Sequence, residues 1–500
     1  MRRRSLVGAI LTAAAVLLPV FGLPAVAAVA PHPGMATAQV SADPYLNRAA
    51  QHATEVEPDT VAAGHTVLSV FQVGRWDNGC ADNIGWAKST NGTDWQHGYL
   101  PGLTRFSSPP GPFVRASDPA VAYNAAFGEW IVSSLACNGT SPNPKAAVSS
   151  PAVEVNISFD GVHWSKAIIA ARIKKGQHFD KEWITCDNSP ASRFYGNCYM
   201  QWDLANFGAA LVQMITSRDG GFHWSAPATT RGHLHGIGGE PVVQPNGTVV
   251  VPILGFIGSS LDLVAFRSTN GGRSWGRTTV VTPTFLHFPA GNLRGPVFQT
   301  VAEDAAGRIY VSWSDCRFRP ACSANDMVLT TSADGVHWTP VTRIPIDPVT
   351  STVDHIGGGL GADPTTSGRH ARLGLFYYFY PHADCTVATC RLYMGYVSST
   401  DGGRRWSAPR VLAGPMRLTE LPRAPGRMVG DYQGVAVVPG GNAFAAFAVA
   451  GIPSGAQHFS EAMYDVTGGV PVTGGSRPAS PAGIRRHLTP AGQPGVVHTR

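Results

Sequence analysis

Short runs of β-forming residues fill most of the chain, and turns rich in Gly, Pro, Asn and Asp separate them. The segment 241–254 is typical: an apolar run at 241–244, an Asn-Gly turn at 246–247 and a second run at 248–254. Apolar positions at helical spacing are almost absent. The pattern therefore predicts an all-β protein whose strands are joined by tight turns.

One motif recurs six times, at intervals of 51 to 69 residues between successive third positions. We call the copies boxes; they read STNGTDW (89–95), SFDGVHW (158–164), SRDGGFHW (217–224), STNGGRSW (268–275), SADGVHW (332–338) and STDGGRRW (399–406). The central Asn-Gly or Asp-Gly supplies the positive φ of a tight turn, and the Ser and Asp side chains can bond turn N–H groups. Repeats at this interval indicate an array of similar supersecondary units.

These boxes resemble the Asp-box (BNR) repeats of the sialidase-like superfamily, and the resemblance covers roughly residues 50–466. It implies a β-propeller of four-stranded blades, each with a box as the hairpin between its third and fourth strands. Candidate inner strands begin near Glu57, Asp118, Trp183, Glu240, Arg294, Ile356 and Asp431. Their number favours seven blades; six blades plus extra strands is the alternative. The propeller is expected over 51–467, and the segment 29–50 can supply a strand that closes the last blade.

Both ends of the chain differ from this body. Three arginines, an apolar run and Ala25-Val26-Ala27 predict an export signal at 1–28, and hence a secreted protein that leaves the membrane after cleavage. Residues 468–500 are rich in Gly, Pro and Arg and are expected to be a disordered tail. The formal net charge of +6 comes mainly from these ends. The nearly neutral body argues against nucleic acid as a partner.

Eight cysteines suit an oxidising compartment. Six of them form three pairs that are close in sequence, and Cys80 and Cys137 remain. We expect the disulfides Cys186–Cys198, Cys316–Cys322, Cys385–Cys390 and Cys80–Cys137, although eight cysteines allow about 105 connectivities. A zinc site is the rival interpretation, and the absence of any C-x-x-C pair disfavours it.

Polar residues gather where the inner strands are predicted to start. The resemblance implies exo-sialidase hydrolysis of terminal sugars, in which arginines clamp a sugar carboxylate and a Tyr–Glu pair and an Asp perform the chemistry. The residues that fit are Arg115, Arg294 and Arg427 for the clamp, Asp431 beside the substrate, Glu240 and Tyr432 as the nucleophile pair, and Asp118 as the acid. The Arg-Ile-Pro sequence expected before the first box occurs only at 343–345.

Other interpretations remain open. A non-catalytic propeller can bind glycans or proteins through the aromatic residues Trp76, Trp183, Trp202, Tyr377, Tyr378 and Tyr380. A structural calcium ion can sit among Asp118, Asp180, Asp354 and Asp431, because carboxylates are its preferred ligands. No other cofactor is expected. The predicted partner is a carbohydrate or glycoprotein, and the predicted state is a monomer.

Overall fold

The computed structural model describes residues 35–481, except 142, 144, 174–176, 207–208 and 295–297. The predicted export signal at 1–28 and the last residues of the predicted tail lie outside this range. Within it the helices are four single turns: η1 (Ala290–Asn292), η2 (Pro320–Cys322), η3 (Gly368–His370) and η4 (Leu418–Glu420). None of the helices in this part of the chain has the length and apolar character needed to cross a membrane. The prediction of an all-β protein is confirmed.

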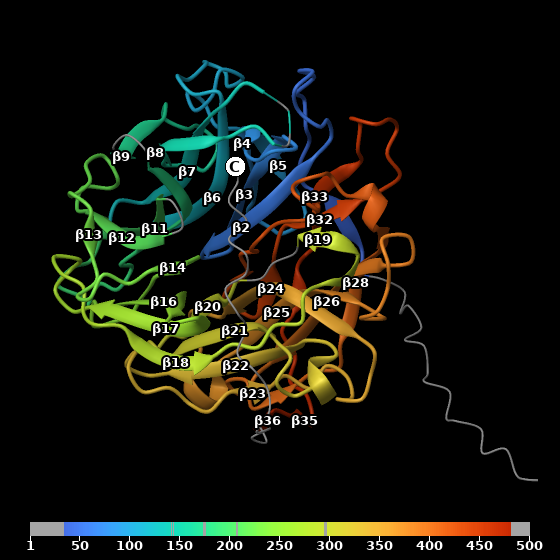
Figure 1. The fold of residues 1–500 in the computed structure, drawn as a ribbon. Coiled ribbons are helices and arrows are strands. Elements are labelled where there is room, and N and C mark those ends of the chain that lie inside the picture. Colours follow the sequence, from blue (N-terminus) through green and yellow to red (C-terminus); the bar gives the residue numbers. More distant parts are fainter. Residues whose placement is uncertain are drawn as a thin grey trace, which may run out of the picture. The chain divides into compact units, whose positions relative to one another are not determined.

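Strands follow one another in seven successive antiparallel groups (Figure 1). The first three groups are β2 (Glu55–Ala63), β3 (Thr66–Arg75), β4 (Ala81–Ser89) and β5 (Gln96–Tyr99); β6 (Arg115–Asn124), β7 (Glu129–Asn138), β8 (Ser149–Ser158) and β9 (Ile168–Arg172); and β10 (His178–Cys186), β11 (Cys198–Asn206), β12 (Ala209–Ser217) and β13 (Ala228–Thr229). The fourth contains β14 (Gly236–Ile237), β15 (Val242–Val243), β16 (Val249–Ile257), β17 (Ser260–Ser268) and β18 (Thr279–Pro283).

The remaining groups follow the same order. They are β20 (Thr300–Glu303), β21 (Ile309–Asp315), β22 (Asp326–Ser332) and β23 (Thr342–Arg343); then β24 (Asp354–Ala362), β25 (Leu373–Tyr380), β26 (Arg391–Ser399) and β28 (Arg410–Arg417); and last β30 (Ala436–Val437), β31 (Asn442–Phe444), β32 (Phe447–Ala450) and β33 (Glu461–Val466). Two short pairs lie outside these groups: β19 (Leu293–Arg294) with β29 (Arg427–Met428), and β27 (Arg405–Trp406) with β35 (Arg477–Pro478).

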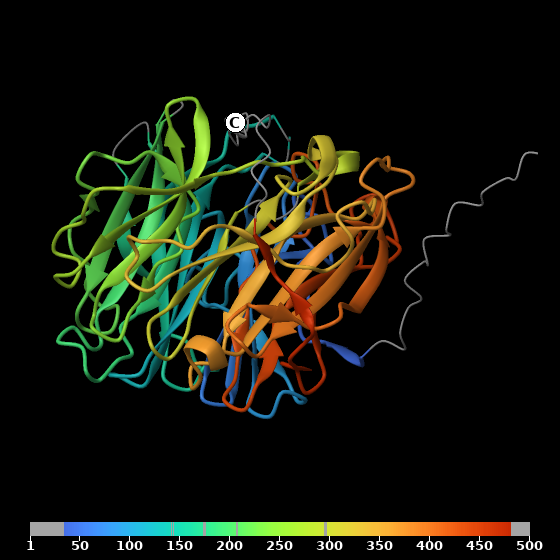
Figure 2. The ribbon, with the colours of Figure 1, turned by 90° about the horizontal axis from the view of Figure 1, so that it is seen from below.

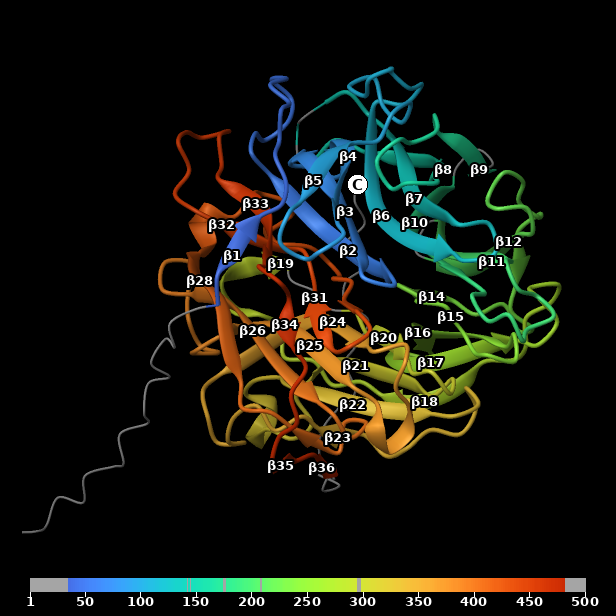
Figure 3. The same cartoon turned by 180° about the vertical axis from the view of Figure 1, so that it is seen from behind.

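The first strands of the groups contact one another in sequence. The contacts run from β2 to β6, β10, β15, β20 and β24, then to β30, and return from β30 to β2. Among the described residues these strands share no hydrogen-bonded ladder with one another, although the first two groups form one eight-stranded sheet through β4 and β6, and the strands of the last group belong to two sheets. Figure 3 shows the same succession from behind, with β2, β6, β14, β20 and β24 nearest the middle of the view.

Both ends of the described chain pair with earlier strands. β1 (Thr37–Gln39) pairs with β33 and completes the last group, within the segment expected to supply such a strand. The predicted tail does not lose structure at 468: β34 (Val470–Pro471) pairs with β31, and β36 (Ser480–Pro481) pairs with β23. The predicted start of the disordered tail at 468 is therefore wrong. Backbone hydrogen bonds extend the sheets to residue 481, and composition alone does not reveal such bonds.

The six boxes are the turns that follow β4, β8, β12, β17, β22 and β26. In the second box the Ser158 hydroxyl accepts the Gly161 N–H at 2.8 Å, and Asp160 Oδ1 accepts the N–H groups of Val162 and His163 at 2.8 and 2.7 Å. Gly161 has φ of 71°, the conformation that favours glycine. In the first sheet Val67 pairs with both Ala62 and Ser89, so the box lies at the end of the sheet where β2 finishes.

Hydrophobic clusters fill the spaces between neighbouring sheets. One of them packs Ile131 and Val155 of the second sheet against Ile184, Met200 and Trp202 of the third. Burying each such side chain contributes about 1.5–3 kcal/mol relative to leaving it exposed. Figure 2 shows the sheets from a direction at right angles to Figure 1, with their long strands running alongside one another.

The four expected disulfides are confirmed. They are Cys80–Cys137, Cys186–Cys198, Cys316–Cys322 and Cys385–Cys390, and the described residues leave no cysteine free. The first joins two neighbouring groups, because Cys80 directly precedes β4 and Cys137 lies in β7.

Candidate functional site

The first strands of several sheets share a bulge near their beginning. The pairing register shifts after Val56, Ser117 and Asp180 in β2, β6 and β10. The residues in these bulges that take a left-handed backbone are Glu57, Asp118 and Lys181, with φ of 56°, 48° and 50°. Such a conformation costs a non-glycine residue roughly 1–2 kcal/mol, and residues of this kind cluster at functional sites.

These bulges bring one ammonium group against three carboxyl groups. Lys181 Nζ lies 3.4 Å from Glu57 Oε1, 3.2 Å from Asp118 Oδ2 and 2.8 Å from Asp431 Oδ2. Each of the four side chains is at most 6% exposed, so water and salt screen these interactions only slightly. We call these four residues and Arg294 the Lys181 cluster.

Arg294 joins the cluster through a strand pair between distant segments. Arg294 lies on β19, which runs parallel to β29 with Arg294 opposite Met428, three residues before Asp431. Its Nε and Nη2 donate to the two oxygens of Asp431 at 2.9 and 2.5 Å. This bidentate geometry makes the contact strong and fixes its direction.

A second layer of polar side chains holds the carboxyl groups in place. Ser117 donates to Asp118 Oδ1 at 2.5 Å. Gln72 donates to Glu57 and, at 3.1 Å, to the Ser117 hydroxyl. Arg75 in turn donates to Gln72 Oε1 at 2.7 Å. The first two sheets therefore fix the rotamers of Glu57 and Asp118.

The three carboxyl groups of the Lys181 cluster share two cationic groups, so they divide into two protonation states. Burial raises the pKa of Glu57 to about 8, and Lys181 counters this only in part. Burial also opposes ionisation of Asp118, but Lys181 and Ser117 outweigh it and hold the pKa of Asp118 below its ordinary value. Against the same burial, Arg294 and Lys181 lower the pKa of Asp431. These opposite shifts favour a protonated Glu57 beside ionised Asp118 and Asp431 at neutral pH.

A small cavity of about 40 Å³ adjoins the cluster, and we call it the rim pocket. Its lining includes Arg75, Asp118, Asp180, Lys181 and Arg294. Two buried donors of this lining, Arg75 Nε and Arg294 Nη1, have no hydrogen-bond partner, whereas Asp118 Oδ2 faces Lys181 Nζ at 3.2 Å. Two guanidinium groups with unused N–H donors suit an anionic ligand group such as a carboxylate.

The structure does not gather the three arginines of the expected clamp. Arg115 is fully buried and donates to Asn78, Gly79 O and Gly139 O at 2.7–2.8 Å. Arg427 donates to Leu421 O at 2.7 Å. Only Arg294 lines the rim pocket, where it meets Asp431 and Asp118. Arg75, at the end of β3, lines this pocket, whereas the predicted Arg115 and Arg427 do not.

Glu240 and Tyr432 border a common narrow space, yet no hydrogen bond joins them. Glu240 Oε2 accepts the Val301 N–H at 2.8 Å, which ties one sheet to the next. The Tyr432 hydroxyl donates to Pro119 O at 3.0 Å, and burial raises the pKa of Tyr432 well above its usual value. In this arrangement the tyrosine is a neutral hydrogen-bond donor.

The expected calcium ligands are divided between two places. The Lys181 ammonium occupies the position between Asp118 and Asp431 that a cation would take. Asp354 instead accepts the Asn325 N–H at 2.7 Å and contacts His287 Nδ1 at 3.2 Å. The four carboxylates therefore do not form one calcium site.

Another group of possible ligands consists of Asp326, Asp347 and His355, whose ligand atoms lie within 4.8 Å of one another. Arg319 and Arg343 already contact both carboxylates at 2.7–2.9 Å. Two guanidinium charges balance two carboxylate charges, so the electrostatics do not favour a divalent ion at this position.

Five of the six aromatic residues predicted to bind a glycan or protein belong to the core instead. Trp76, Trp202, Tyr377, Tyr378 and Tyr380 are at most 2% exposed. Trp183 is the exception, since it is partly exposed and lines a cavity between the first strands. It meets Tyr432 edge to face, with ring centroids 5.1 Å apart.

The family model described as BNR repeat-like domain matches residues 145–362. This match spans four of the six boxes and confirms the resemblance to BNR repeats within that segment. No curated protein matches the chain.

Similar solved structures include a Hadza microbial sialidase, Hz136, with 15% identity, coverage of 65% of this chain and 64% of that chain, and a TM-score of 0.43. An ulvan lyase of a polysaccharide lyase family has 11% identity, coverage of 85% and 96%, and a TM-score of 0.46. The Trypanosoma rangeli sialidase in complex with 2,3-difluorosialic acid has 11% identity, coverage of 88% and 59%, and a TM-score of 0.45. The chain thus spans less than two thirds of the length of each of these two sialidases.

Proposed function

We propose that this chain, which contains a BNR repeat-like domain, is a glycoside hydrolase that removes terminal sugars from glycans at the Lys181 cluster. The observation that carries the proposal is the placement of Glu57 and Asp118 at equivalent bulges of β2 and β6, where both face Lys181 and their pKa values shift in opposite directions. Neighbouring carboxyl groups whose surroundings push their pKa values apart are the arrangement that acid–base catalysis uses.

Each group has a defined part in the reaction. Protonated Glu57 donates its proton to the leaving glycosidic oxygen. Ionised Asp118 stabilises the positive charge that develops on the sugar, or accepts a proton from the attacking water. Lys181 and Asp431 keep this pair in its two protonation states, and Gln72 and Ser117 keep its geometry.

Arg75 and Arg294 favour a sugar that carries a carboxylate, as an exo-sialidase substrate does. Both line the rim pocket, and each has a buried N–H that no protein group accepts. A carboxylate is the natural acceptor for such groups. This arrangement replaces the clamp of Arg115, Arg294 and Arg427 by a pair of arginines.

The architecture that fits this function is a propeller of seven blades. Its support is the cycle of contacts among the first strands of the seven groups, which returns from β30 to β2. In such a propeller the Lys181 cluster lies near the axis, at the end opposite the boxes. The six boxes then have the structural role of closing hairpins.

We also propose that the protein acts outside the cell as a monomer on carbohydrate or glycoprotein. Four disulfides support an oxidising compartment. The export signal predicted at 1–28 supports the same location. A signal-cleaved chain recovered from culture medium, identified by its mature N-terminus, tests this proposal.

The enzyme proposal is tested with a panel of fluorogenic exo-glycosides that includes a sialoside. We expect turnover of at least one acidic glycoside, and a fall in kcat/KM of about 10²–10⁴-fold in Glu57→Gln and Asp118→Asn. Glu154→Gln is the matched control, since Glu154 on β8 is a buried glutamate whose pKa is raised to about 8 outside the cluster. Tyr432→Phe tests the alternative nucleophile, and our assignment predicts at most a small loss.

A second candidate is a non-catalytic glycan-binding propeller. The small volume of the rim pocket, about 40 Å³, and the bonded state of Tyr432 favour it. It predicts binding of the same acidic sugars without turnover. Saturable binding by wild type, weakened in Arg75→Met, together with no hydrolysis of any panel member, establishes the second candidate and refutes the first.

A further inference from the structure

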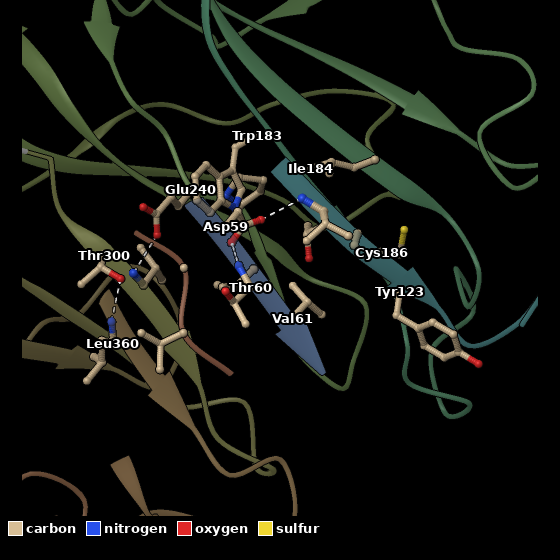
Figure 4. A pocket seen from close by; sticks show the side chains of 18 of the residues that line it. Asp59, Thr60, Val61, Tyr123, Trp183, Ile184, Cys186, Glu240, Thr300 and Leu360 are labelled. Carbon is tan, nitrogen blue, oxygen red and sulfur yellow. Dashed lines mark hydrogen bonds between the residues drawn. The ribbon is translucent and has the colours of Figure 1, made fainter. Parts of the chain in front are cut away.

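A second and larger cavity, of about 170 Å³, lies among the first strands; we call it the axial pocket (Figure 4). All seven groups contribute to its wall. One lining residue from each, in chain order, is Asp59, Tyr123, Trp183, Glu240, Thr300, Leu360 and Gln433. A wall built from segments so far apart in the sequence exists only in the assembled molecule.

The axial pocket is distinct from the rim pocket. Its residues follow the cluster residues along the same segments: Asp59 comes after Glu57, Ile184 after Lys181 and Gln433 after Asp431. Because β2 ends beside a box, the axial pocket lies on the box side of the cluster. The two pockets share no lining residue.

Gln433 contributes a buried, unpartnered polar side chain to the residues that line this pocket. The side chain is 2% exposed, and neither its amide nitrogen nor its amide oxygen has a hydrogen-bond partner. Leaving buried polar atoms without partners costs about 1–3 kcal/mol each. A hydroxyl group both donates and accepts, so a molecule rich in hydroxyls satisfies the donor and the acceptor of this amide.

Trp183 gives the same wall an aromatic surface. Tyr432 packs edge to face against its ring and holds it beside the cavity. Trp183, Glu240 and Asp59, labelled in Figure 4, line the same cavity, so its wall combines an aromatic ring with polar groups. Aromatic rings beside hydrogen-bonding side chains suit ligands with one apolar face and several hydroxyls.

The charge of the lining argues for a neutral ligand. Neither Lys nor Arg occurs among the lining residues in the described chain, so an anion has no cationic partner. Asp59 Oδ1 and Oδ2 accept the N–H groups of Thr60 and Val121, both at 2.8 Å. Burial raises the pKa of Asp59 to about 7 and that of Glu240 well above its usual value, which disfavours a cation as well.

We propose that the axial pocket binds a neutral polyhydroxyl molecule of the size of one monosaccharide. A cavity of about 150 Å³ is known to accept a six-membered ring, and the axial pocket is slightly larger than that. The proposal goes beyond hydrolysis at the Lys181 cluster and does not depend on it, because the two sites use different residues.

Binding of galactose, glucose, mannose, N-acetylglucosamine and glycerol to the whole chain is measured by saturation-transfer NMR and calorimetry. We expect at least one sugar to bind with a Kd of about 1 mM or tighter. Gln433→Leu keeps the side-chain size and removes the amide, and it should weaken binding at least about tenfold. Gln96→Leu, on the exposed strand β5, is the matched control and should bind as wild type does.

Val61→Phe is the second variant. Val61 lines the cavity, and a phenyl ring at this position should fill part of it and block the ligand. It decides the question if Gln433→Leu does not fold. Glu57→Gln should bind the neutral sugar normally whether or not the protein is a hydrolase. Absence of saturable binding by wild type overturns the proposal. Unchanged affinity in every folded pocket variant overturns it too.

Discussion

Three residues in the Lys181 cluster have backbones that their side chains disfavour. Glu57, Asp118 and Lys181 all have φ near 50°, and each lies at the bulge of a first strand. The bulges bring the three side chains together, so that Lys181 forms an ion pair with Asp118 and also contacts the carboxyl group of Glu57. The same three bulges therefore account for both the left-handed backbone and the grouping of these side chains.

The first prediction at this scale concerns Lys181. In Lys181→Met the ionised Asp118 and Asp431 lose their shared ammonium, so the free energy of unfolding at pH 7 should fall by about 3–5 kcal/mol. Without Lys181, burial should raise the pKa of Asp118, whereas Arg294 still pairs with Asp431. Protonation of Asp118 as the pH falls then removes its unpaired charge, and the deficit relative to wild type should shrink from pH 7 towards pH 5.

Urea unfolding at the two pH values measures this effect. Lys166→Met, on the exposed surface, is the control and should change stability by less than about 0.5 kcal/mol. A deficit that stays constant with pH would show that Lys181 contributes packing rather than charge.

The sequence predicts some residues of the site and not others. Asp118 could be predicted because it lies near the start of an inner strand, and Asp431 because it closely precedes the last group. Arg75 could not, because it reaches the rim only when the end of β3 pairs beside the start of β2. Arg115 was misplaced in the clamp because its residue type does not reveal that Asn78 and two carbonyls bind it.

At the scale of the element, the box is the best-predicted feature. Its turn needs only local contacts between Ser, Asp and Gly, and these contacts are encoded within seven or eight residues. The strands were predictable for the same reason, since each is bounded by a turn. The bulges were not, because a bulge depends on the register between two strands rather than on either sequence alone.

The box also yields a prediction about stability. Hydrogen bonds from His163 and from the N–H groups of His163 and Val162 lower the pKa of Asp160. Their contribution is present above the unfolded pKa of about 3.9 and is lost as the pH falls below it. Asp160→Ala should lower the free energy of unfolding at pH 7 by about 1 kcal/mol, the usual value of such a side-chain cap.

Asp160→Asn is the matched control and should retain most of the stability, because the first and fourth boxes carry Asn91 and Asn270 at this position. Asn91 accepts the N–H groups of Thr93 and Asp94 at 2.9 Å as the aspartates do. Chemical denaturation of the two variants measures the difference. Equal losses in both would mean that charge, rather than the acceptor oxygen, matters in the box.

At the scale of the whole molecule, the sequence predicts strands that come into contact in chain order, and β2, β6, β10, β15, β20, β24 and β30 do so. The count of seven blades stays a prediction. The segment at Arg294 is not one of these strands: it forms β19 and pairs with β29, while β20 begins at Thr300. That pairing over more than 130 residues could not be predicted from local patterns, yet it carries Arg294 to Asp431.

The same assembly explains why the cluster is formed from distant residues. Glu57, Asp118 and Lys181 belong to the first three groups, and Asp431 precedes the last. They meet because the last group returns to the first. The catalytic proposal therefore depends on closure of the whole molecule, and any loss of that closure should remove the site.

The most direct test is the pH dependence of kcat/KM on the best substrate of the panel, for wild type and Glu57→Gln. If protonated Glu57 is the acid, the wild-type rate should fall as the pH rises through about 8, where Glu57 loses its proton. The residual activity of Glu57→Gln should lack this alkaline limb. An alkaline limb that is unchanged in Glu57→Gln, with full activity, would contradict the account.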